Sequence, residues 1–384
     1  MKFLSFLAKK DLQNKICLLR VDFNIQKTDL SKNHLRISAI LPTINFLLKN
    51  KAKVVILSHR GRPIKSKISR LTITGTQKSQ KYSLKPFVKI LSSLLKKSVY
   101  FIDFKKEFNV SEIKKIINSP AGDIFLLENL RFFEGEEKND KKFAKRLASL
   151  GDFYVNDAFS DSHRNNASIT AITEFLPSYA GFSFKNEIEN LDKAIKNFKK
   201  PLVVILAGAK ISDKIGLIKN FLSRADYFLI GGGMANTFAA AQGLPVGDSL
   251  YENKMFFLAR QFLKSKKIIL PIDTIVYKRQ ILDIGSRTIE QYSKIIKNAK
   301  TIIWNGPMGY IEDKRFRKGS EAIAGAILKS KAFSVIGGGE TIASLRFLNS
   351  KSYILNSNIF ISTGGGAMLE YLAGKKLPGL EALN

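Results

Sequence analysis

The sequence predicts an α/β protein with two doubly wound parallel-sheet (Rossmann-like) domains, and three observations support this fold class. The chain has 384 residues, which suits two domains at roughly 100–200 residues each. Short apolar runs rich in β-branched residues alternate with longer segments whose apolar residues recur at three- and four-residue spacing. The short runs are continuously apolar, as in parallel strands covered on both faces.

The first half of the chain contains the strands of one sheet and their connecting helices. The expected strands are Ile16–Val21, Val54–Leu57, Val99–Ile102, Ile124–Leu127 and Phe153–Val155. Apolar spacing predicts helices over Leu84–Leu95 and Asp140–Ala148. Tyr179–Gly181 is expected to form a turn near the end of this half.

The second half repeats the alternation. Its expected strands are Leu202–Leu206, Phe228–Ile230, Ile268–Leu270, Ile302–Trp304, Ser334–Ile336 and Ile359–Ile361. Its expected helices include Asp213–Leu222, Ile289–Ile296 and Phe316–Leu328. Ligands of open parallel sheets bind beyond the carboxyl ends of the strands, so functional residues are expected there.

A polar, charged helix is expected over Lys185–Phe198 and would join the two domains as a hinge. The predicted domains are therefore residues 1–184 and 185–372, followed by a tail of about 373–384. No repeat of fixed period and no low-complexity linker interrupts them.

Composition and motif content exclude several classes of protein. The longest uncharged stretch, residues 227–247, carries five glycines and a proline, so no membrane span is expected. The apolar part of the N-terminus is too short for a secretion signal, and the single Cys17 fits a reducing cytoplasm. The sequence contains no P-loop motif, no dinucleotide-binding motif and no zinc-ligand spacing.

The chain is strongly basic, with a formal net charge of +31. The excess is spread along it, but residues 30–102 hold 16 lysines and arginines and no acid. Two interpretations stay open at this point. The stretch is a solvated lysine-rich surface, or it attracts an anion, either a phosphorylated metabolite or a nucleic acid.

Arginine and histidine side chains follow the expected strands of the first half. A single arginine more often makes a surface salt bridge, whereas several at the strand ends of one sheet indicate an anion site. The candidates are Arg36, His59, Arg62, Arg131 and Arg164. They predict a site for a small phosphorylated molecule.

Glycine-rich turns follow the expected strands of the second half. They are Gly231–Gly233, Trp304–Pro307, Gly337–Gly339 and Gly364–Gly366. Glycine lets backbone amides approach a phosphate chain, and a helix N-terminus adds partial positive charge. Lys210 and Lys214 lie four residues apart, on one face of a starting helix. An arginine-lined half and a glycine-lined half together predict phosphoryl transfer between two ligands, one per domain, in a cleft that closes.

The chain resembles the phosphoglycerate kinase family through motifs that occur in family order. They are Arg20-Val-Asp-Phe-Asn, Ser58-His-Arg-Gly-Arg-Pro, Glu128-Asn-Leu-Arg-Phe, Val155-Asn-Asp-Ala-Phe, Gly208-Ala-Lys-Ile-Ser-Asp-Lys, Trp304-Asn-Gly-Pro-Met-Gly and Ser362-Thr-Gly-Gly-Gly-Ala. The resemblance implies reversible transfer between 1,3-bisphosphoglycerate with Mg-ADP and 3-phosphoglycerate with Mg-ATP. It also implies a monomer whose tail after Leu372 folds back on the first domain.

The resemblance assigns roles to individual residues. The implied phosphoglycerate site comprises Asp22, Asn24, Arg36, His59, Arg62, Arg131 and Arg164. The implied nucleotide site comprises Lys210, Lys214, Asn305, Pro307, Glu312, Gly338, Gly339, Glu340 and Thr341. Glu340 is the expected ligand of nucleotide-bound Mg²⁺, and Arg36 and Lys210 are expected to stabilise transition-state charge.

Departures from the family pattern and the basic stretch 30–102 leave two alternatives. Glu340 replaces the usual aspartate, Asn166 replaces a histidine, and residues 271–285 are shorter than the stretch that helps line the adenine side. A kinase inactivated by this shortening is one alternative. A nucleic-acid-binding protein of kinase-like fold is the other, but the basic residues lack the interleaved aromatics of a single-strand platform. An assay with 3-phosphoglycerate and ATP separates them.

Overall fold

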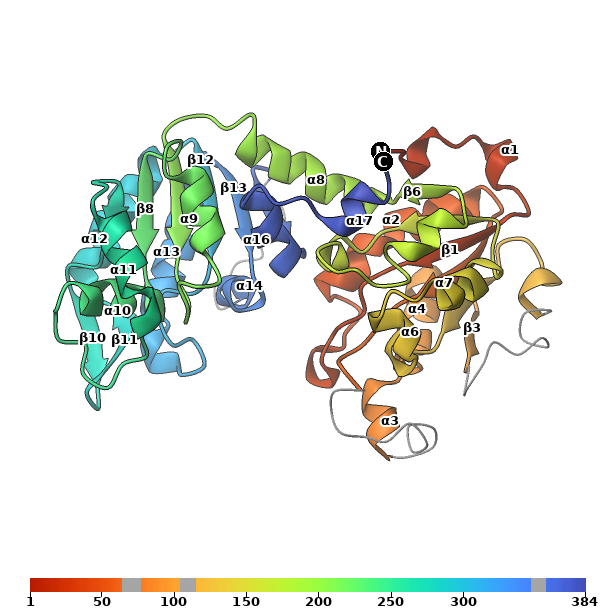
Figure 1. Cartoon of the computed structure of the whole chain (residues 1–384), viewed down its shortest axis with the longest axis horizontal. Helices are drawn as coiled ribbons and strands as arrows, with labels where there is room; N and C mark the ends of the chain where they lie inside the picture. Colours follow the sequence, from red (N-terminus) through yellow and green to blue (C-terminus); the bar gives the residue numbers. More distant parts are fainter. Residues whose placement is uncertain (64–76, 104–114, 347–356) are drawn as a thin grey trace. The chain divides into compact units, whose positions relative to one another are not determined.

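The computed structural model describes residues 1–63, 77–103, 115–346 and 357–384. This part of the chain forms two compact units (Figure 1). Unit 1 comprises Met1–Glu187 and Lys376–Asn384, and unit 2 comprises Ile188–Lys375. The sequence places the boundary after Phe184, and the two units meet three residues later, inside helix α8 (Phe182–Ile195).

Unit 1 contains a six-stranded sheet in the order β3-β4-β2-β1-β5-β6, with every pairing parallel. Its strands are β1 Ile16–Arg20, β2 Lys53–Leu57, β3 Val99–Ile102, β4 Ile124–Leu127, β5 Phe153–Asn156 and β6 Ser178–Ala180. Its α-helices are α1 Lys9–Leu12, α2 Leu35–Lys49, α3 Gln77–Tyr82, α4 Pro86–Leu95, α6 Glu134–Glu137, α7 Lys141–Ala148 and α17 Pro378–Glu381. The strand order reverses between β1 and β5, which is where such a sheet binds its ligand.

Unit 2 contains a second six-stranded parallel sheet, in the order β14-β13-β12-β7-β8-β9. Its strands are β7 Leu202–Leu206, β8 Tyr227–Ile230, β9 Ile268–Ile269, β12 Thr301–Asn305, β13 Phe333–Gly337 and β14 Ile359–Ser362. Its α-helices are α9 Ile215–Phe221, α10 Gly232–Ala241, α11 Phe256–Leu263, α12 Ser286–Asn298, α13 Lys318–Lys329, α14 Gly339–Arg346 and α16 Gly366–Leu372. This is the 3-2-1-4-5-6 strand order of nucleotide-binding sheets, and it reverses between β7 and β12.

The fold class expected from the sequence is confirmed, because both large sheets are parallel and their strands alternate with helices along the chain. Strands β1, β2, β4, β7 and β12 are buried at every residue. A helix needs about 18 or more consecutive apolar residues to cross a membrane. Within the described ranges, no helix has the length and apolar character to do so.

One expectation for local structure was wrong, and one element was not anticipated. The turn expected at Tyr179–Gly181 is the short edge strand β6, in which the amide of Ala180 donates to the carbonyl of Lys2. Residues 274–284 form an unexpected antiparallel hairpin, β10 Thr274–Tyr277 with β11 Gln280–Ile284. Strand β6 has only three residues, too few to show an alternating pattern in the sequence. Strand β10 is exposed at every residue and so lacks the apolar run of a buried strand.

The C-terminal tail and the start of α8 are each held within unit 1 by a hydrogen bond. The amide of Gly379 in the C-terminal tail donates to the carbonyl of Ser162, and Leu377 and Leu383 are buried. Asp157, which follows β5, accepts the amide of Phe184 at 2.9 Å and so caps the first turn of α8.

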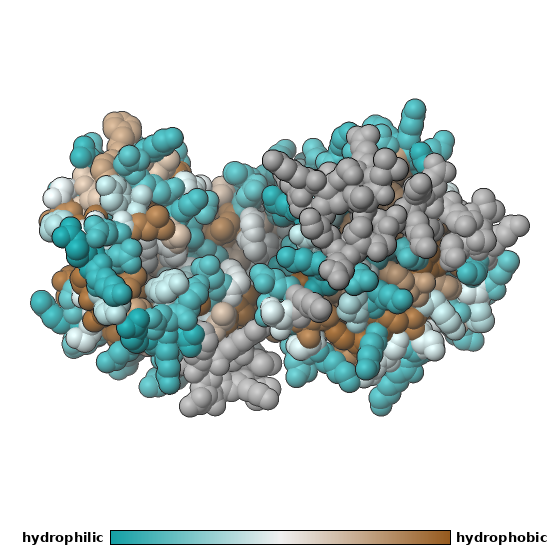
Figure 2. Space-filling view, turned by 90° about the horizontal axis from the view of Figure 1, so that it is seen from below, coloured by the Kyte–Doolittle hydropathy of each residue, from teal (hydrophilic) through white to brown (hydrophobic). Residues whose placement is uncertain are grey.

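Cys17 in β1 is a buried free thiol, and burial raises its pKa well above the usual value. On the face shown in Figure 2, hydrophilic side chains spread over the surface of both units.

Candidate active site

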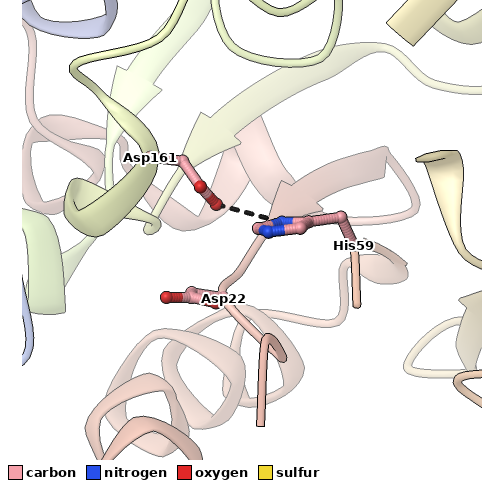
Figure 3. A group of neighbouring side chains, drawn as sticks. All are labelled: Asp22, His59 and Asp161. Atoms are coloured by element: carbon pink, nitrogen blue, oxygen red, sulfur yellow. Dashed lines mark ion pairs between the residues drawn. The ribbon is translucent and has the colours of Figure 1, made fainter. Parts of the chain in front are cut away.

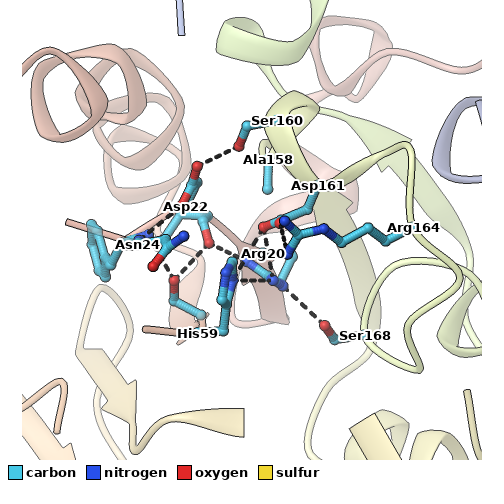
Figure 4. A network of polar contacts seen from close by, with 12 residues as sticks. Arg20, Asp22, Asn24, His59, Ala158, Ser160, Asp161, Arg164 and Ser168 are labelled. Carbon is cyan, nitrogen blue, oxygen red and sulfur yellow. Dashed lines mark hydrogen bonds and ion pairs between the residues drawn. The ribbon is translucent and has the colours of Figure 1, made fainter. Parts of the chain in front are cut away.

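A buried arginine organises the carboxyl edge of the unit 1 sheet (Figure 4). Arg20, the last residue of β1, is 1% exposed. Its guanidinium lies 3.1 Å from the Asp161 carboxylate, 2.9 Å from the Ser168 hydroxyl and 3.0 Å from Nδ1 of His59. The residues that meet here follow β1, β2 and β5, which are neighbours in the sheet. Strand-end geometry therefore brings them together, as the sequence predicts.

The surroundings of this cluster shift the pKa values of both Asp161 and His59. Burial alone would raise the pKa of Asp161, but His59, Arg20 and Arg164 outweigh it and hold that pKa well below its usual range. Burial lowers the pKa of His59, against the opposing effect of Asp161. Nδ1 of the ring lies 3.0 Å from the Arg20 guanidinium and 3.2 Å from the Asp161 carboxylate. Nε2 is buried and has no hydrogen-bond partner among the described residues, so it is available to a ligand.

Asp22, Asn24 and Arg36 form a second group at the same edge. The Asp22 carboxylate lies 3.1 Å from the Arg36 guanidinium, which also donates to the carbonyl of Asn24 at 2.7 Å. Asp22 also accepts the hydroxyl of Ser160 and the amide of Asn24. The Asn24 side chain accepts the amide of Gly61. Arg36 is thus fixed in orientation while a quarter of its side chain, 26%, stays exposed.

Two more predicted arginines lie nearby and a third stays at the surface. Arg131 is 3% exposed and donates to the carbonyl of Gly61 at 2.8 Å. Burial lowers its pKa, with Asp161 opposing the shift. Arg164 lies 3.4 Å from Asp161. Arg62 is exposed. Arg164 thus shares Asp161 with His59, and Arg131 lies close enough to His59 for its charge to act on it. Arg36 is held by Asp22, whose carboxylate is within 4.8 Å of the His59 ring, and Arg62 stays solvated.

Three of these side chains have the spacing of a metal site (Figure 3). Ligand atoms of Asp22, His59 and Asp161 lie within 4.8 Å of one another. Both carboxylates, however, are already neutralised by guanidinium groups, Asp22 by Arg36 and Asp161 by Arg20, each at 3.1 Å. A cation here would compete with two fixed arginines, so the cluster suits an anion better.

Unit 2 contains a cavity of about 620 Å³ at the carboxyl ends of β7, β8 and β12. Of the predicted nucleotide residues, Pro307, Glu312 and Glu340 line it. The rest of its wall includes the glycine turns after β7 and β8 and much of the β10–β11 hairpin. The shortened stretch 271–285 therefore still contributes to the cavity wall, and it does so as a hairpin.

The glycines at this edge allow backbone to pack on backbone. Gly306 has φ +98°, and an added Cβ would lie 2.0 Å from the carbonyl oxygen of Ala207. Gly232 has φ +60°, and its Cβ would lie 2.7 Å from the amide nitrogen of Gly208. The turns after β7, β8 and β12 thus touch through their main chains, and only glycine fits these positions.

Other predicted nucleotide residues hold the turns together and do not line the cavity. The Asn305 amide donates to the carbonyl of Gly337 at 2.8 Å, and the Thr341 hydroxyl accepts the amide of Gly306 at 2.7 Å. Lys214 is 7% exposed, and burial lowers its pKa against the opposing charges of Asp213 and Glu340. Lys210 is exposed, Gly339 begins helix α14, and Gly338 directly precedes it.

Comparison with known proteins decides the family. A model described as Phosphoglycerate kinase matches residues 7–375. The chain belongs to the phosphoglycerate kinase family. The resemblance predicted from the motifs is confirmed. As a member, it is a phosphotransferase that moves a phosphoryl group between 1,3-bisphosphoglycerate and ADP, with a carboxyl group as acceptor in the reverse direction.

Relatives in the phosphoglycerate kinase family align over nearly the whole chain. The phosphoglycerate kinase of Pseudothermotoga lettingae is 43% identical over 97% of this chain and 96% of its own. That of Finegoldia magna is 41% identical over 98% of both chains. The solved structure from Coxiella burnetii has a TM-score of 0.81 at 36% identity, covering 99% of this chain and 98% of its own. That from Pyrococcus horikoshii has a TM-score of 0.82 at 32% identity, covering 100% and 98%.

Several residues of this phosphoglycerate kinase site were quoted in motifs but given no role, or were not singled out. They are Arg20, Ser160, Asp161, Ser168 and Glu136. Glu136 is fully buried and accepts both the amide and the hydroxyl of Ser168, which in turn accepts from Arg20. A charged residue at the end of a buried strand, as Arg20 is, was the one available signal.

Proposed function

We propose that the basic edge of unit 1 binds 3-phosphoglycerate or 1,3-bisphosphoglycerate. The observation that carries this assignment is a set of buried ring and guanidinium nitrogens that make no hydrogen bond within the described part of the chain. They are Nε2 of His59, Nε of Arg131, which lies 3.5 Å from the Glu137 carboxylate, and Nη1 of Arg164, which lies 3.4 Å from that of Asp161. Buried donors of this kind normally have partners, so a ligand carboxylate or phosphate would complete them.

The remaining predicted residues fit the same ligand. Arg36 is partly exposed and held by Asp22 and Asn24, so it is oriented before the ligand arrives. Arg62 is exposed at the surface that follows Gly61 and would approach an outer phosphate. Arg131 and Arg164 supply two further guanidinium groups. Forked guanidinium donors match the paired oxygens of carboxylate and phosphate.

The cavity of unit 2 is the proposed nucleotide site. Its volume of about 620 Å³ lies within the roughly 300–1,000 Å³ of small-molecule sites. Pro307 and Glu312 line it, and a carboxylate such as Glu312 suits a ribose hydroxyl. Lys214 and Lys210 would face the phosphates. Asn305, Gly338, Gly339 and Thr341 would act through the turns that they join.

Mg²⁺ is proposed to bind with the nucleotide at Glu340. This side chain lines the cavity, is exposed and lies at the start of α14, close enough to Lys214 for their charges to interact. Mg²⁺ prefers carboxylate and phosphate oxygens and often uses a single protein carboxylate beside them, so the donor present fits. When bound, the ion would neutralise charge on the nucleotide phosphates.

Catalysis would rest on fixed positive charge. In phosphoryl transfer, negative charge spreads over the moving group, and preorganised donors lower the barrier. Arg36 and Lys210 are the proposed catalytic residues, with residues 1–184 and the tail 373–384 as the phosphoglycerate-binding domain and 185–372 as the nucleotide-binding domain. Transfer between two ligands requires them to meet in line, and closure about the hinge at α8 would supply that step.

We further propose a monomeric enzyme that works in the cytoplasm, where its substrates occur and where a free buried thiol such as Cys17 persists.

The deciding experiment is a coupled assay with 3-phosphoglycerate, ATP and Mg²⁺ in which the nucleotide is varied. Saturable turnover is expected, together with binding of 3-phosphoglycerate to the enzyme without nucleotide. Purified protein that shows no turnover but binds RNA with a steep salt dependence would overturn the kinase in favour of the nucleic-acid alternative. Turnover with undiminished 3-phosphoglycerate binding after replacement of both Arg131 and Arg164 would overturn the placement of that substrate.

A further inference from the structure

Asp283, the fourth residue of β11, lies where three segments of unit 2 meet. It is 3% exposed and forms part of the cavity wall. The three segments are the β10–β11 hairpin, the loop 306–317 after β12, and the N-terminus of α13. The hairpin and α13 are labelled in Figure 1. No sequence motif singles this residue out.

Both oxygens of Asp283 accept backbone amides. Oδ2 accepts the amide of Gly319 at 2.8 Å, and Oδ1 accepts that of Ile284 at 2.9 Å. Gly319 is the second residue of α13, whose N-cap residue Arg317 makes no side-chain cap. The hairpin therefore supplies, from outside the helix, the acceptor that a first-turn amide needs. Negative charge is also favoured at this end of a helix.

The carboxylate also sets the spacing of the segments around it. An added Cβ on Gly309 would lie 2.4 Å from Oδ1 of Asp283, and one on Gly319 would lie 2.2 Å from it. Both main chains thus rest directly against this side chain. The amide of Tyr310 adds a bond to the carbonyl of Leu282 in the hairpin at 2.8 Å. Loop 306–317 is therefore packed against Asp283 at Gly309 and bonded to the neighbouring Leu282 at Tyr310.

Burial of this carboxylate is unfavourable by itself. Burial raises its pKa to about 6, the bonds from Gly319 and Ile284 oppose the shift, and Glu321 of α13 is the charged neighbour that raises it further. The guanidinium of Arg317 donates to the carbonyl of Ile311 in the loop. Burial of an apolar side chain here would be less unfavourable to folding than burial of a carboxylate. A carboxylate is therefore expected only if the two amides need an acceptor at this point.

We propose that Asp283 is a positioning residue of the nucleotide cavity. By accepting the amides of Gly319 and Ile284, it fixes the loop that carries Pro307 and Glu312 against the β10–β11 hairpin. It thereby sets the affinity for the adenine nucleotide. The proposal rests on the placement of the nucleotide in this cavity.

The hairpin offers a matched control at its other end. Asp273 accepts the amides of Thr288 and Arg287 at 2.7 and 3.0 Å and so caps α12. It does not line the cavity. Asp273→Asn and Asp283→Asn each remove one carboxylate that caps a helix, but only the second borders the loop that carries Pro307 and Glu312.

The test is steady-state kinetics of the full chain with ATP and 3-phosphoglycerate varied separately. Asp283→Asn should raise the KM for ATP roughly tenfold, since an amide can accept through one oxygen only, while kcat and the KM for 3-phosphoglycerate change less than about twofold. Asp273→Asn should lower the melting temperature and leave the KM for ATP unchanged. KM does not depend on the fraction of enzyme folded, so partial unfolding leaves the comparison valid.

A pH series separates positioning from mere structural support. The ratio of the KM for ATP, Asp283→Asn to wild type, should fall toward one as the pH drops below about 6, because both proteins then carry a neutral side chain. The ratio cancels the ionisation of the substrates. Gly319→Ala, which pushes the intact carboxylate away, should raise the KM for ATP in the same way.

Glu312→Gln distinguishes the two ways to fail. If it raises the KM for ATP and Asp283→Asn does not, the role of Asp283 is wrong. If neither variant changes that KM, the placement of the nucleotide in this cavity is wrong. A ratio that stays constant from pH 7.5 to 5.5, or equal changes in both KM values, would also overturn the positioning role.

Discussion

The carboxylate of Asp22 lies 3.1 Å from the guanidinium of Arg36. The same guanidinium donates to the carbonyl of Asn24, so an arginine on α2 is held by two residues that follow β1. Its side-chain entropy is reduced before a substrate binds, and its charge is oriented at little further cost. This relationship makes Arg36 the strongest candidate for stabilising transition-state charge.

Replacement of Arg36 by alanine should lower kcat by a factor of at least roughly 10²–10³, the effect of removing one fixed donor of transition-state charge. The coupled assay measures it. Lys49→Ala, at the exposed end of the same helix, should leave kcat unchanged and serves as the control. A loss below about threefold for Arg36→Ala would show that this guanidinium does not act on the transition state.

Asp161→Asn should destabilise unit 1 by about 3–5 kcal/mol, because it leaves Arg20 buried without a counter-charge. Urea unfolding followed by circular dichroism measures the free energy of unfolding. The exposed pair of Glu290 and Lys294 provides the comparison, and Glu290→Gln should be indistinguishable from wild type. A loss below about 1 kcal/mol for Asp161→Asn would mean that water solvates this pair.

Asp157 predicts a defined pH dependence of stability. Burial raises its pKa to about 7, while bonds from Thr43, Phe184 and Ser183 oppose the shift. The folded state therefore binds this proton more tightly than the unfolded chain, and the contribution of Asp157 to stability decreases as the pH rises from about 4 to 7.

Asp157→Asn removes this titration. The free energy of unfolding of the variant minus that of wild type should increase between pH 4 and 7, by up to about 4 kcal/mol, and level off above pH 7. Chemical denaturation at half-unit pH steps gives the curve. The difference would be flat if solvent reaches the carboxylate in the folded state.

Glu340→Gln should raise the Mg²⁺ concentration for half-maximal activity roughly tenfold, which corresponds to about 1.4 kcal/mol. The amide keeps an oxygen but loses the charge that favours the cation. Titration of Mg²⁺ at fixed ATP measures the shift, and Glu370→Gln on α16 is the control. An unchanged requirement for Mg²⁺ would exclude Glu340 as its ligand.

The sequence predicts the central strands well because they are buried on both faces and continuously apolar. Strand β7 is apolar and buried at every residue, and its neighbour β12 is buried throughout with an apolar centre at Ile302–Trp304. The β10–β11 hairpin escapes the same reasoning. All of β10 is exposed, and the two turn residues Lys278 and Arg279 have φ of +46° and +61° without the glycine or asparagine that usually marks such a turn.

The site is predictable to the extent that strand ends determine it. His59 and Arg164 could be placed at the edge of the sheet because they follow β2 and β5. The partners that fix their charge could not, since Asp161 and Glu136 reach the same point through tertiary packing. Likewise, no local signal shows that Asn305 and Thr341 bond to neighbouring turns instead of facing the cavity.

The buried position of Cys17 makes the enzyme convenient for site-specific labelling. It is the single cysteine of the chain, and its raised pKa leaves almost no thiolate at neutral pH. Two cysteines introduced at exposed positions, one in each unit, would then be the reactive thiols for a pair of spectroscopic probes. Distances between such probes, with and without both substrates, would test the proposed movement about α8 without any need to remove the native residue.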